Sequence, residues 1–351
     1  MAKVILHVGA HKTGTTYLQN LFHLNRARLA EAGIHYPDIG PNTAHHALAG
    51  AWMNLPDIPD RFYGAAGPDG LWQKIIDQYA TAPGTLLLSA ENFSRCYPEE
   101  IDMVDLARRL EPFESVQVIY VMRRQTEMVQ SLWLQLAKSD RMLSVYSYVR
   151  DAIERRRAVG VRIDHGTFYT VLRRGFAAEQ ITLLDYSQLR RTAGGIGQAF
   201  LDLMDSGLDI GDLIEPPAED SNISPDPLAF WVASQIAGKK RPLPDLQSLV
   251  NDALGRTGRR TTLLARHEYH KLDTRYRQAN ALLVDKVQSV QPGFSFEDPA
   301  PPDDLLYRGE IPEETWVDIL SRLKDGRFQG PGAPQIAERI RSGLRRLWTA
   351  G

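Results

Sequence analysis

Four short apolar runs, separated by longer segments of helical periodicity, constrain the fold of this chain most strongly. The runs are residues 4–8, 85–89, 116–122 and 181–185. Each is short and almost continuously apolar, as expected of strands that are covered on both faces. Buried strands that alternate with helical segments predict an α/β fold of three layers with a central, mainly parallel sheet.

Helical periodicity follows the first and third runs directly. One helix is expected from about Thr15 to Gly33, and a second helical pattern continues through residues 129–136. In open parallel sheets, ligands bind where strands end and helices begin. Binding residues are therefore expected at these two junctions.

The pattern changes after residue 220. Pro-rich turns are followed by a long helical pattern over residues 263–290, a Pro- and Asp-rich stretch over 292–312 that is typical of a surface loop, and a basic helix expected around 336–348. We expect an α/β core over residues 1–220 and a mainly helical extension over 221–351 packed on the same domain. The role of the terminal basic helix stays open.

Charge and cysteine content exclude several classes of function. The net charge of −2 provides no general attraction to nucleic acid or to an anionic membrane. Cys96 is the only cysteine, which excludes an internal disulfide and a multi-cysteine metal site. No apolar run approaches the roughly 18 residues of a spanning helix, and the first residues are too polar for a signal peptide. We expect a cytoplasmic protein without integral membrane contact.

Residues 9–16, with the sequence GAHKTGTT, form the strongest motif. Gly9 and Gly14 allow the backbone to wrap around an anion at the start of the following helix. The lysine that follows the second glycine in nucleotide triphosphatases is replaced by Thr15, while Lys12 stands earlier in the loop. The third run continues into Arg123 and Arg124 instead of an acidic residue that would be a convincing second magnesium ligand. The loop therefore favours an anion reaction without a metal.

A second motif begins where the third run ends: Arg123 follows the run directly, and Ser131 stands eight positions after Arg123. With these two motifs the chain resembles the sulfotransferases that use 3′-phosphoadenosine-5′-phosphosulfate (PAPS), particularly a bacterial branch whose chains open with a strand followed by HKTGTT. The resemblance covers about residues 3–290 and implies a P-loop-like fold. It also implies transfer of a sulfuryl group from PAPS, with adenosine 3′,5′-bisphosphate as the product.

The resemblance assigns roles to individual residues. Lys12 would offset the charge that develops on the leaving phosphate, and the donor's 5′-phosphosulfate would be bound by the loop residues His11, Lys12, Thr13, Gly14, Thr15 and Thr16. Arg123 and Ser131 would bind the 3′-phosphate, which distinguishes PAPS from ATP. Tyr186, directly after the fourth run, would lie near the adenine.

Two candidates compete for the general base that deprotonates the acceptor. Glu91 follows the second run and so lies at the same edge as the phosphate loop. His45 and His46 follow the first helix, and histidine has a suitable pKa for the task. The residues leave this choice open, and no metal site is expected.

Two other functions are compatible with the same residues. A P-loop kinase or nucleotide triphosphatase would share the strand, loop and helix, although the displaced lysine disfavours it. A non-catalytic scaffold of the same fold is the second alternative. The acceptor is expected to be a small molecule, a saccharide or a lipid, and not a nucleic acid; its identity and the oligomeric state stay open.

Overall fold

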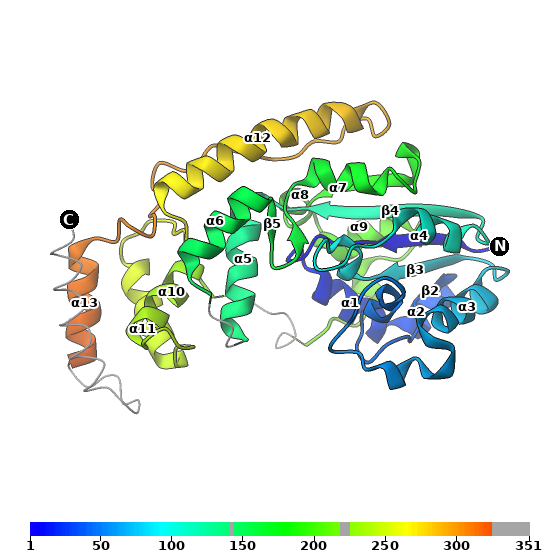
Figure 1. Ribbon diagram of the computed structural model, residues 1–351, viewed down its shortest axis with the longest axis horizontal. Helices are drawn as coiled ribbons and strands as arrows, with labels where there is room; N and C mark the ends of the chain where they lie inside the picture. The colour runs from blue at the N-terminus through cyan, green and yellow to red at the C-terminus, as the bar shows by residue number, and fades with distance from the viewer. Residues whose placement is uncertain (140–142, 218–224, 325–351) are drawn as a thin grey trace. The chain divides into compact units, whose positions relative to one another are not determined.

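The computed structural model describes residues 1–139, 143–217 and 225–324 of the chain (Figure 1). The chain divides into two compact units. The first unit comprises Met1–Met128, Arg156–Asn222 and Arg275–Asp298, and the second comprises Val129–Arg155, Ile223–Thr274 and Pro299–Gly351. Sequence analysis places one boundary after residue 220. The observed division has a boundary close to that residue, but it also assigns residues 129–155 to the second unit and residues 275–298 to the first.

A five-stranded sheet forms the centre of the first unit. Its order is β2 (Ile34–His35), β3 (Thr85–Ser89), β1 (Lys3–His7), β4 (Ser115–Met122) and β7 (Ile181–Asp185). All four neighbouring pairs are parallel. The prediction of an α/β fold with a mainly parallel central sheet is confirmed. Strand β2 was not predicted, because two residues are too few to produce a recognisable pattern.

Helices lie on both faces of this sheet, which gives the three expected layers (Figure 1). On one face, apolar side chains of β1, β3 and β4 form a core with helices α1 (Thr15–Leu24), α2 (Arg26–Glu31) and α9 (Gly195–Leu203). On the other face, Tyr120 of β4 packs against Phe168 of α7 (His165–Leu172), with ring centroids 4.8 Å apart.

The single helix expected from Thr15 to Gly33 is wrong, because the structure has two helices separated at Asn25. The Asn25 amide donates to the carbonyls of Leu21 and Ile214, each at 2.8 Å, and its oxygen accepts from the Ile214 N–H. An asparagine that bonds backbone groups in this way competes with the helical hydrogen bonds. The break therefore depends on a partner 189 residues away, which local periodicity does not reveal.

The first unit contains further elements beside the sheet. They include helices α3 (Gly67–Tyr79), α4 (Met103–Leu110) and α8 (Tyr186–Leu189), several 3₁₀ helices, among them η1 (His46–Ala51) and η4 (Glu91–Ser94), and the antiparallel pair β5 (Arg157–Ala158) and β6 (Val161–Arg162).

The described part of the second unit is helical, as predicted for the C-terminal region. Its helices are α6 (Val145–Arg155), α10 (Pro227–Ile236), α11 (Pro244–Gly255) and α13 (Glu313–Lys324). Helix α5 (Gln125–Lys138) starts in the first unit and continues into the second, whereas α12 (Arg266–Gln288) continues from the second into the first. The basic helix expected at 336–348 lies outside the described residues. Of the helices in the described ranges, none is long and apolar enough to cross a membrane.

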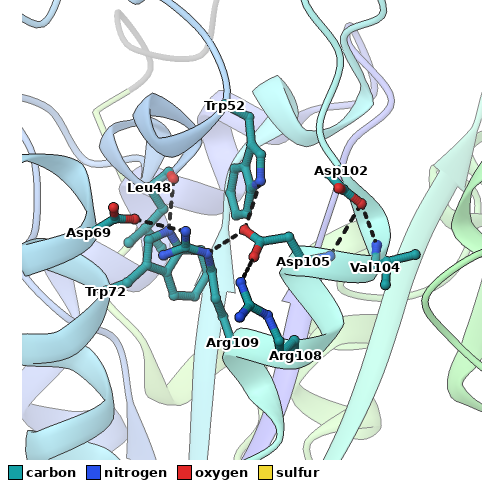
Figure 2. Close-up of polar contacts among 9 residues, drawn as sticks. All are labelled: Leu48, Trp52, Asp69, Trp72, Asp102, Val104, Asp105, Arg108 and Arg109. Atoms are coloured by element: carbon teal, nitrogen blue, oxygen red, sulfur yellow. Dashed lines mark hydrogen bonds and ion pairs between the residues drawn. The ribbon is translucent and has the colours of Figure 1, made fainter.

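A cluster of two tryptophans, an aspartate and an arginine ties α4 to η1 (Figure 2). Asp105 of α4 accepts from Trp52 Nε1 at 3.0 Å and from Arg109 Nε at 2.8 Å. The guanidinium of Arg109 lies 5.0 Å from the Trp52 ring centroid, within the range of a cation–π interaction. Trp72 donates to the carbonyl of Leu48, within η1, at 3.0 Å. This cluster holds in place the turn that begins at His46.

Substitution of Asp105 by alanine tests this link. We expect the Asp105→Ala variant to lose about 1–3 kcal/mol of unfolding free energy, because the Trp52 N–H loses its acceptor and Arg109 keeps only one of its two carboxylate partners, Asp69. Urea unfolding measures the loss. The exposed Glu111, at the end of the same helix, provides the control: Glu111→Ala should stay within about 0.5 kcal/mol of the wild type. Equal stabilities of the two variants would contradict the link.

Candidate functional site

The strand register brings four segments to one edge of the sheet. His7, the last residue of β1, pairs with Ser89 of β3 and Ile119 of β4, and Met122 of β4 pairs with Asp185 of β7. Parallel strands whose ends are level present their following loops at the same edge. The segments that follow β1, β3, β4 and β7 contain the residue 9–16 loop, Glu91, Arg123 and Tyr186, respectively.

The loop after β1 has the backbone geometry of an anion-binding turn. It is bonded to β4 by the Ala10 N–H, which donates to Val121 O at 3.0 Å, and by the Val121 N–H, which donates to Gly9 O at 2.8 Å. Gly14 adopts φ 79° as the N-cap of α1, a conformation that favours glycine. Because glycine has no side chain to cap the helix, the first N–H groups of α1 are suited to bind an anion.

Arg123 is anchored to this loop. Its Nη1 donates to the backbone carbonyl of Lys12 at 2.7 Å, and its guanidinium carbon lies 5.4 Å from the ring centroid of Tyr186. A Cβ atom added to Gly14 would lie 3.6 Å from the Tyr186 ring, so the tyrosine covers the loop at its second glycine. Three motifs that are far apart in the sequence are therefore in contact. The Glu127 carboxylate also pairs with Arg123, at 3.3 Å.

Glu91 lies against the same loop and is engaged through both oxygens. It accepts from the Thr15 hydroxyl at 2.6 Å, and its other oxygen pairs with His11 Nδ1 at 3.2 Å. Burial alone would raise the pKa of Glu91, but His11, His46 and the Thr15 hydroxyl outweigh burial and hold that pKa well below its ordinary value. Glu91 is therefore an ionised carboxylate beside two histidines and a hydroxyl donor.

The two neighbouring histidines have different environments. The buried His45 is engaged at both ring nitrogens: Nε2 contacts Pro37 O at 2.9 Å, and Nδ1 accepts from the Ser89 N–H at 2.9 Å. Burial lowers the pKa of His46, and Glu91 partly opposes that effect. Among the described residues, no group lies within hydrogen-bonding distance of His46 Nδ1 or of His11 Nε2. His46 Nδ1 is thus a buried nitrogen with no described partner, whereas both ring nitrogens of His45 are engaged.

The other expected loop residues differ in what they contact. The Thr13 hydroxyl donates to Ala10 O at 2.7 Å within the loop, and Thr16 is exposed. Ser131 is on α5 and belongs to the second unit, so its role stays a prediction.

One residue that contacts the site, His165, was not predicted from the sequence. The ring of His165 bonds the backbone carbonyl of Arg123, 42 residues earlier in the chain. No spacing or motif in the sequence indicates this contact. Within the described ranges, no group of three or more His, Cys, Asp or Glu side chains is arranged to hold a metal ion.

Several chains of solved structures match this chain. The chain matches no protein-family model and no curated protein. It is similar to the crystal structure of a sulfotransferase from Alicyclobacillus acidocaldarius, with 17% sequence identity over 68% of this chain and 94% of that chain and a TM-score of 0.39.

The buried histidines make stability depend on pH. Burial lowers the pKa of His45 to about 3, against an ordinary value of 6.5. Below about pH 6.5 the unfolded chain therefore binds a proton at His45 that the folded protein does not bind. The contribution of neutral His45 to stability is present in full above pH 6.5 and is lost as the pH falls toward the folded pKa.

We expect the free energy of unfolding to fall by about 1.4 kcal/mol per pH unit for each such histidine between pH 6 and pH 4. Urea unfolding over this range measures the slope for the wild type and for His45→Asn. Asparagine does not titrate and can still accept from the Ser89 N–H. The variant should therefore have the shallower slope; parallel curves would contradict the assignment of His45 as a buried neutral base.

Proposed function

We propose that this chain is a sulfotransferase that transfers a sulfuryl group from PAPS to a hydroxyl or amine of a small-molecule, saccharide or lipid acceptor. The observation that carries the proposal is the contact of Arg123 with both the Lys12 carbonyl and the Tyr186 ring. Through this contact three groups lie together: the loop at a helix N-terminus, which is suited to an anion; an arginine, which is suited to a second phosphate; and a tyrosine, which is suited to an adenine ring.

The charges of these residues suit an anionic nucleotide. The N-terminus of α1 and the Lys12 side chain favour the 5′-phosphosulfate. The planar guanidinium of Arg123 matches the geometry of a phosphate and would bind the 3′-phosphate. Tyr186 offers an aromatic face for the adenine. In this proposal Thr16 donates a hydroxyl bond to the 5′-phosphate, and Thr15 does the same by exchanging its bond to Glu91 for one to the phosphate.

In the proposed reaction, the acceptor oxygen or nitrogen attacks sulfur while the bond from sulfur to the 5′-phosphate oxygen breaks. The negative charge that this oxygen gains is offset by Lys12. The acceptor's proton passes to a base beside the loop.

Glu91 is the base that we propose. In the protein without donor, its pKa is too low for an efficient base, because His11 and His46 stabilise the carboxylate. Binding of an anionic donor to the same loop adds negative charge and raises the pKa of Glu91. The carboxylate would then become a stronger base when the donor is bound. His46 is the second candidate, since its Nδ1 has no described partner.

Thermal unfolding with added nucleotides tests the donor. Adenosine 3′,5′-bisphosphate should raise the melting temperature without any metal. Arg123→Ala should bind this nucleotide about tenfold to a hundredfold more weakly, because a charge-assisted pair is lost. The matched control is Arg191→Ala, since Arg191 is exposed and pairs with Glu297; its affinity should equal that of the wild type.

Other nucleotide responses would contradict the proposal. Stabilisation only by ATP with magnesium would identify a kinase or nucleotide triphosphatase. The absence of any response would favour a non-catalytic scaffold. Unchanged affinity in Arg123→Ala would exclude Arg123 from the phosphate site.

Kinetics of substituted enzymes test the base, once a screen with labelled donor has provided an acceptor. We expect Glu91→Gln to lower kcat by about 10²-fold to 10⁴-fold and to leave the affinity for adenosine 3′,5′-bisphosphate equal or higher, because a negative charge is removed. The control is Glu114→Gln, since Glu114 is exposed at the opposite end of β4. Loss of kcat in His46→Asn but not in Glu91→Gln would assign the base to His46 instead.

A further inference from the structure

A buried chain of hydrogen bonds ends on the backbone of Arg123. Tyr120 Oη lies 2.7 Å from His165 Nδ1, and His165 Nε2 lies 2.8 Å from the Arg123 carbonyl oxygen. A carbonyl oxygen only accepts, so Nε2 must carry the hydrogen. Burial lowers the pKa of His165 to about 4, which keeps the ring neutral at pH 7. In the neutral ring, Nδ1 then accepts from the Tyr120 hydroxyl. The Tyr120 hydroxyl and the His165 Nε2–H thus each donate to one acceptor.

The imidazole has little freedom to move. Tyr120 and His165 are each 1% exposed. The Tyr120 and Phe296 rings pack edge-on against the imidazole, with centroids at 5.6 Å and 5.8 Å. Phe168, on the same helix as His165, packs on Tyr120 as a ring contact, with centroids 4.8 Å apart. A ring packed in this way holds its hydrogen-bond partner in one position.

Arg123 is the first residue after β4, where strand pairing with β7 has ended at Met122. Its carbonyl takes no part in the hydrogen bonds between β4 and β7 and accepts from His165 Nε2 instead. At the other end of the same residue, the guanidinium donates to the Lys12 carbonyl at 2.7 Å. Arg123 is thus held from two sides, its backbone by α7 and its side chain by the loop.

We propose that His165 is a positioning residue for the phosphate-binding arginine, and that the Tyr120–His165 chain sets the direction of the Arg123 side chain toward the donor's 3′-phosphate. The inference rests on the proposed function. A planar guanidinium discriminates between phosphates only if it is held within about 0.5 Å of its productive position. Loss of the His165 bond would let the backbone at Arg123 rotate, and the preference for a nucleotide with a 3′-phosphate would fall.

Isothermal titration of the full chain with two nucleotides tests the inference. Adenosine 3′,5′-bisphosphate and 5′-AMP differ only in the 3′-phosphate, so the ratio of their affinities reports on Arg123 and not on general stability. We expect His165→Ala to weaken binding of the bisphosphate by about tenfold and to change binding of 5′-AMP by less than about twofold. His165→Gln should recover much of the ratio, because its amide can donate to the same carbonyl.

Two further variants separate positioning from packing. Phe168→Leu leaves the hydrogen-bond chain intact but removes packing from Tyr120, so it should lower the melting temperature and keep the affinity ratio. Tyr120→Phe keeps both rings but removes the hydroxyl, so it should lower the ratio in the same direction as His165→Ala. It also serves as the test if His165→Ala does not fold.

The possible outcomes are distinguishable. An unchanged ratio in both His165→Ala and Tyr120→Phe, or an equal loss for both nucleotides, would overturn the positioning role while the donor proposal stands. A wild-type protein that binds the bisphosphate no better than 5′-AMP would overturn the donor proposal, and this inference with it.

Discussion

The hydrogen-bonded register of β1 between β3 and β4 is the constraint on which the candidate site depends. It continues beyond the last residue of β1, since Val8 donates to Ile119 O at 3.0 Å and Ala90 donates to His7 O at 3.0 Å. The residue 9–16 loop and the Glu91 turn therefore start from fixed points. Because side chains alternate between the two faces of a strand, a shift of one residue would turn the core of β1 away from α1 and displace the loop from Arg123.

Charge balance is the second condition at this edge of the sheet. An ionised Glu91 beside a loop suited to anions would repel an anionic ligand if it were unpaired. Its pairing with His11 at 3.2 Å and with the Thr15 hydroxyl offsets that charge locally. The same carboxylate, partly compensated, can respond to a bound anion by a rise in pKa. In the proposed function, Glu91 is thus ionised without a bound anion and becomes a stronger base when an anion binds.

The corner after β4 is supported by a segment from late in the chain. Asp298 accepts from Arg124 Nε at 2.8 Å, and Phe296 packs on His165. The Gln291 side chain bonds the backbone N–H and carbonyl of Leu183 at 3.0 Å and 2.9 Å, so it covers part of the edge strand β7. Residues 291–298 thus stabilise both strands from which Arg123 and Tyr186 emerge.

The sequence by itself determined the α/β class, the bounds of two strands at 85–89 and 181–185, and the junctions from which the site residues emerge. These features follow from local apolar patterns and from glycine spacing, which act over a few residues. Only the tertiary structure decided the break at Asn25, the pairing of His11 with Glu91, the engagement of both His45 nitrogens and the bond from His165 to Arg123. Each of these is a polar contact between residues that are distant in the sequence. The partners of such buried polar groups are decided only when the strands pair and the helices pack on them.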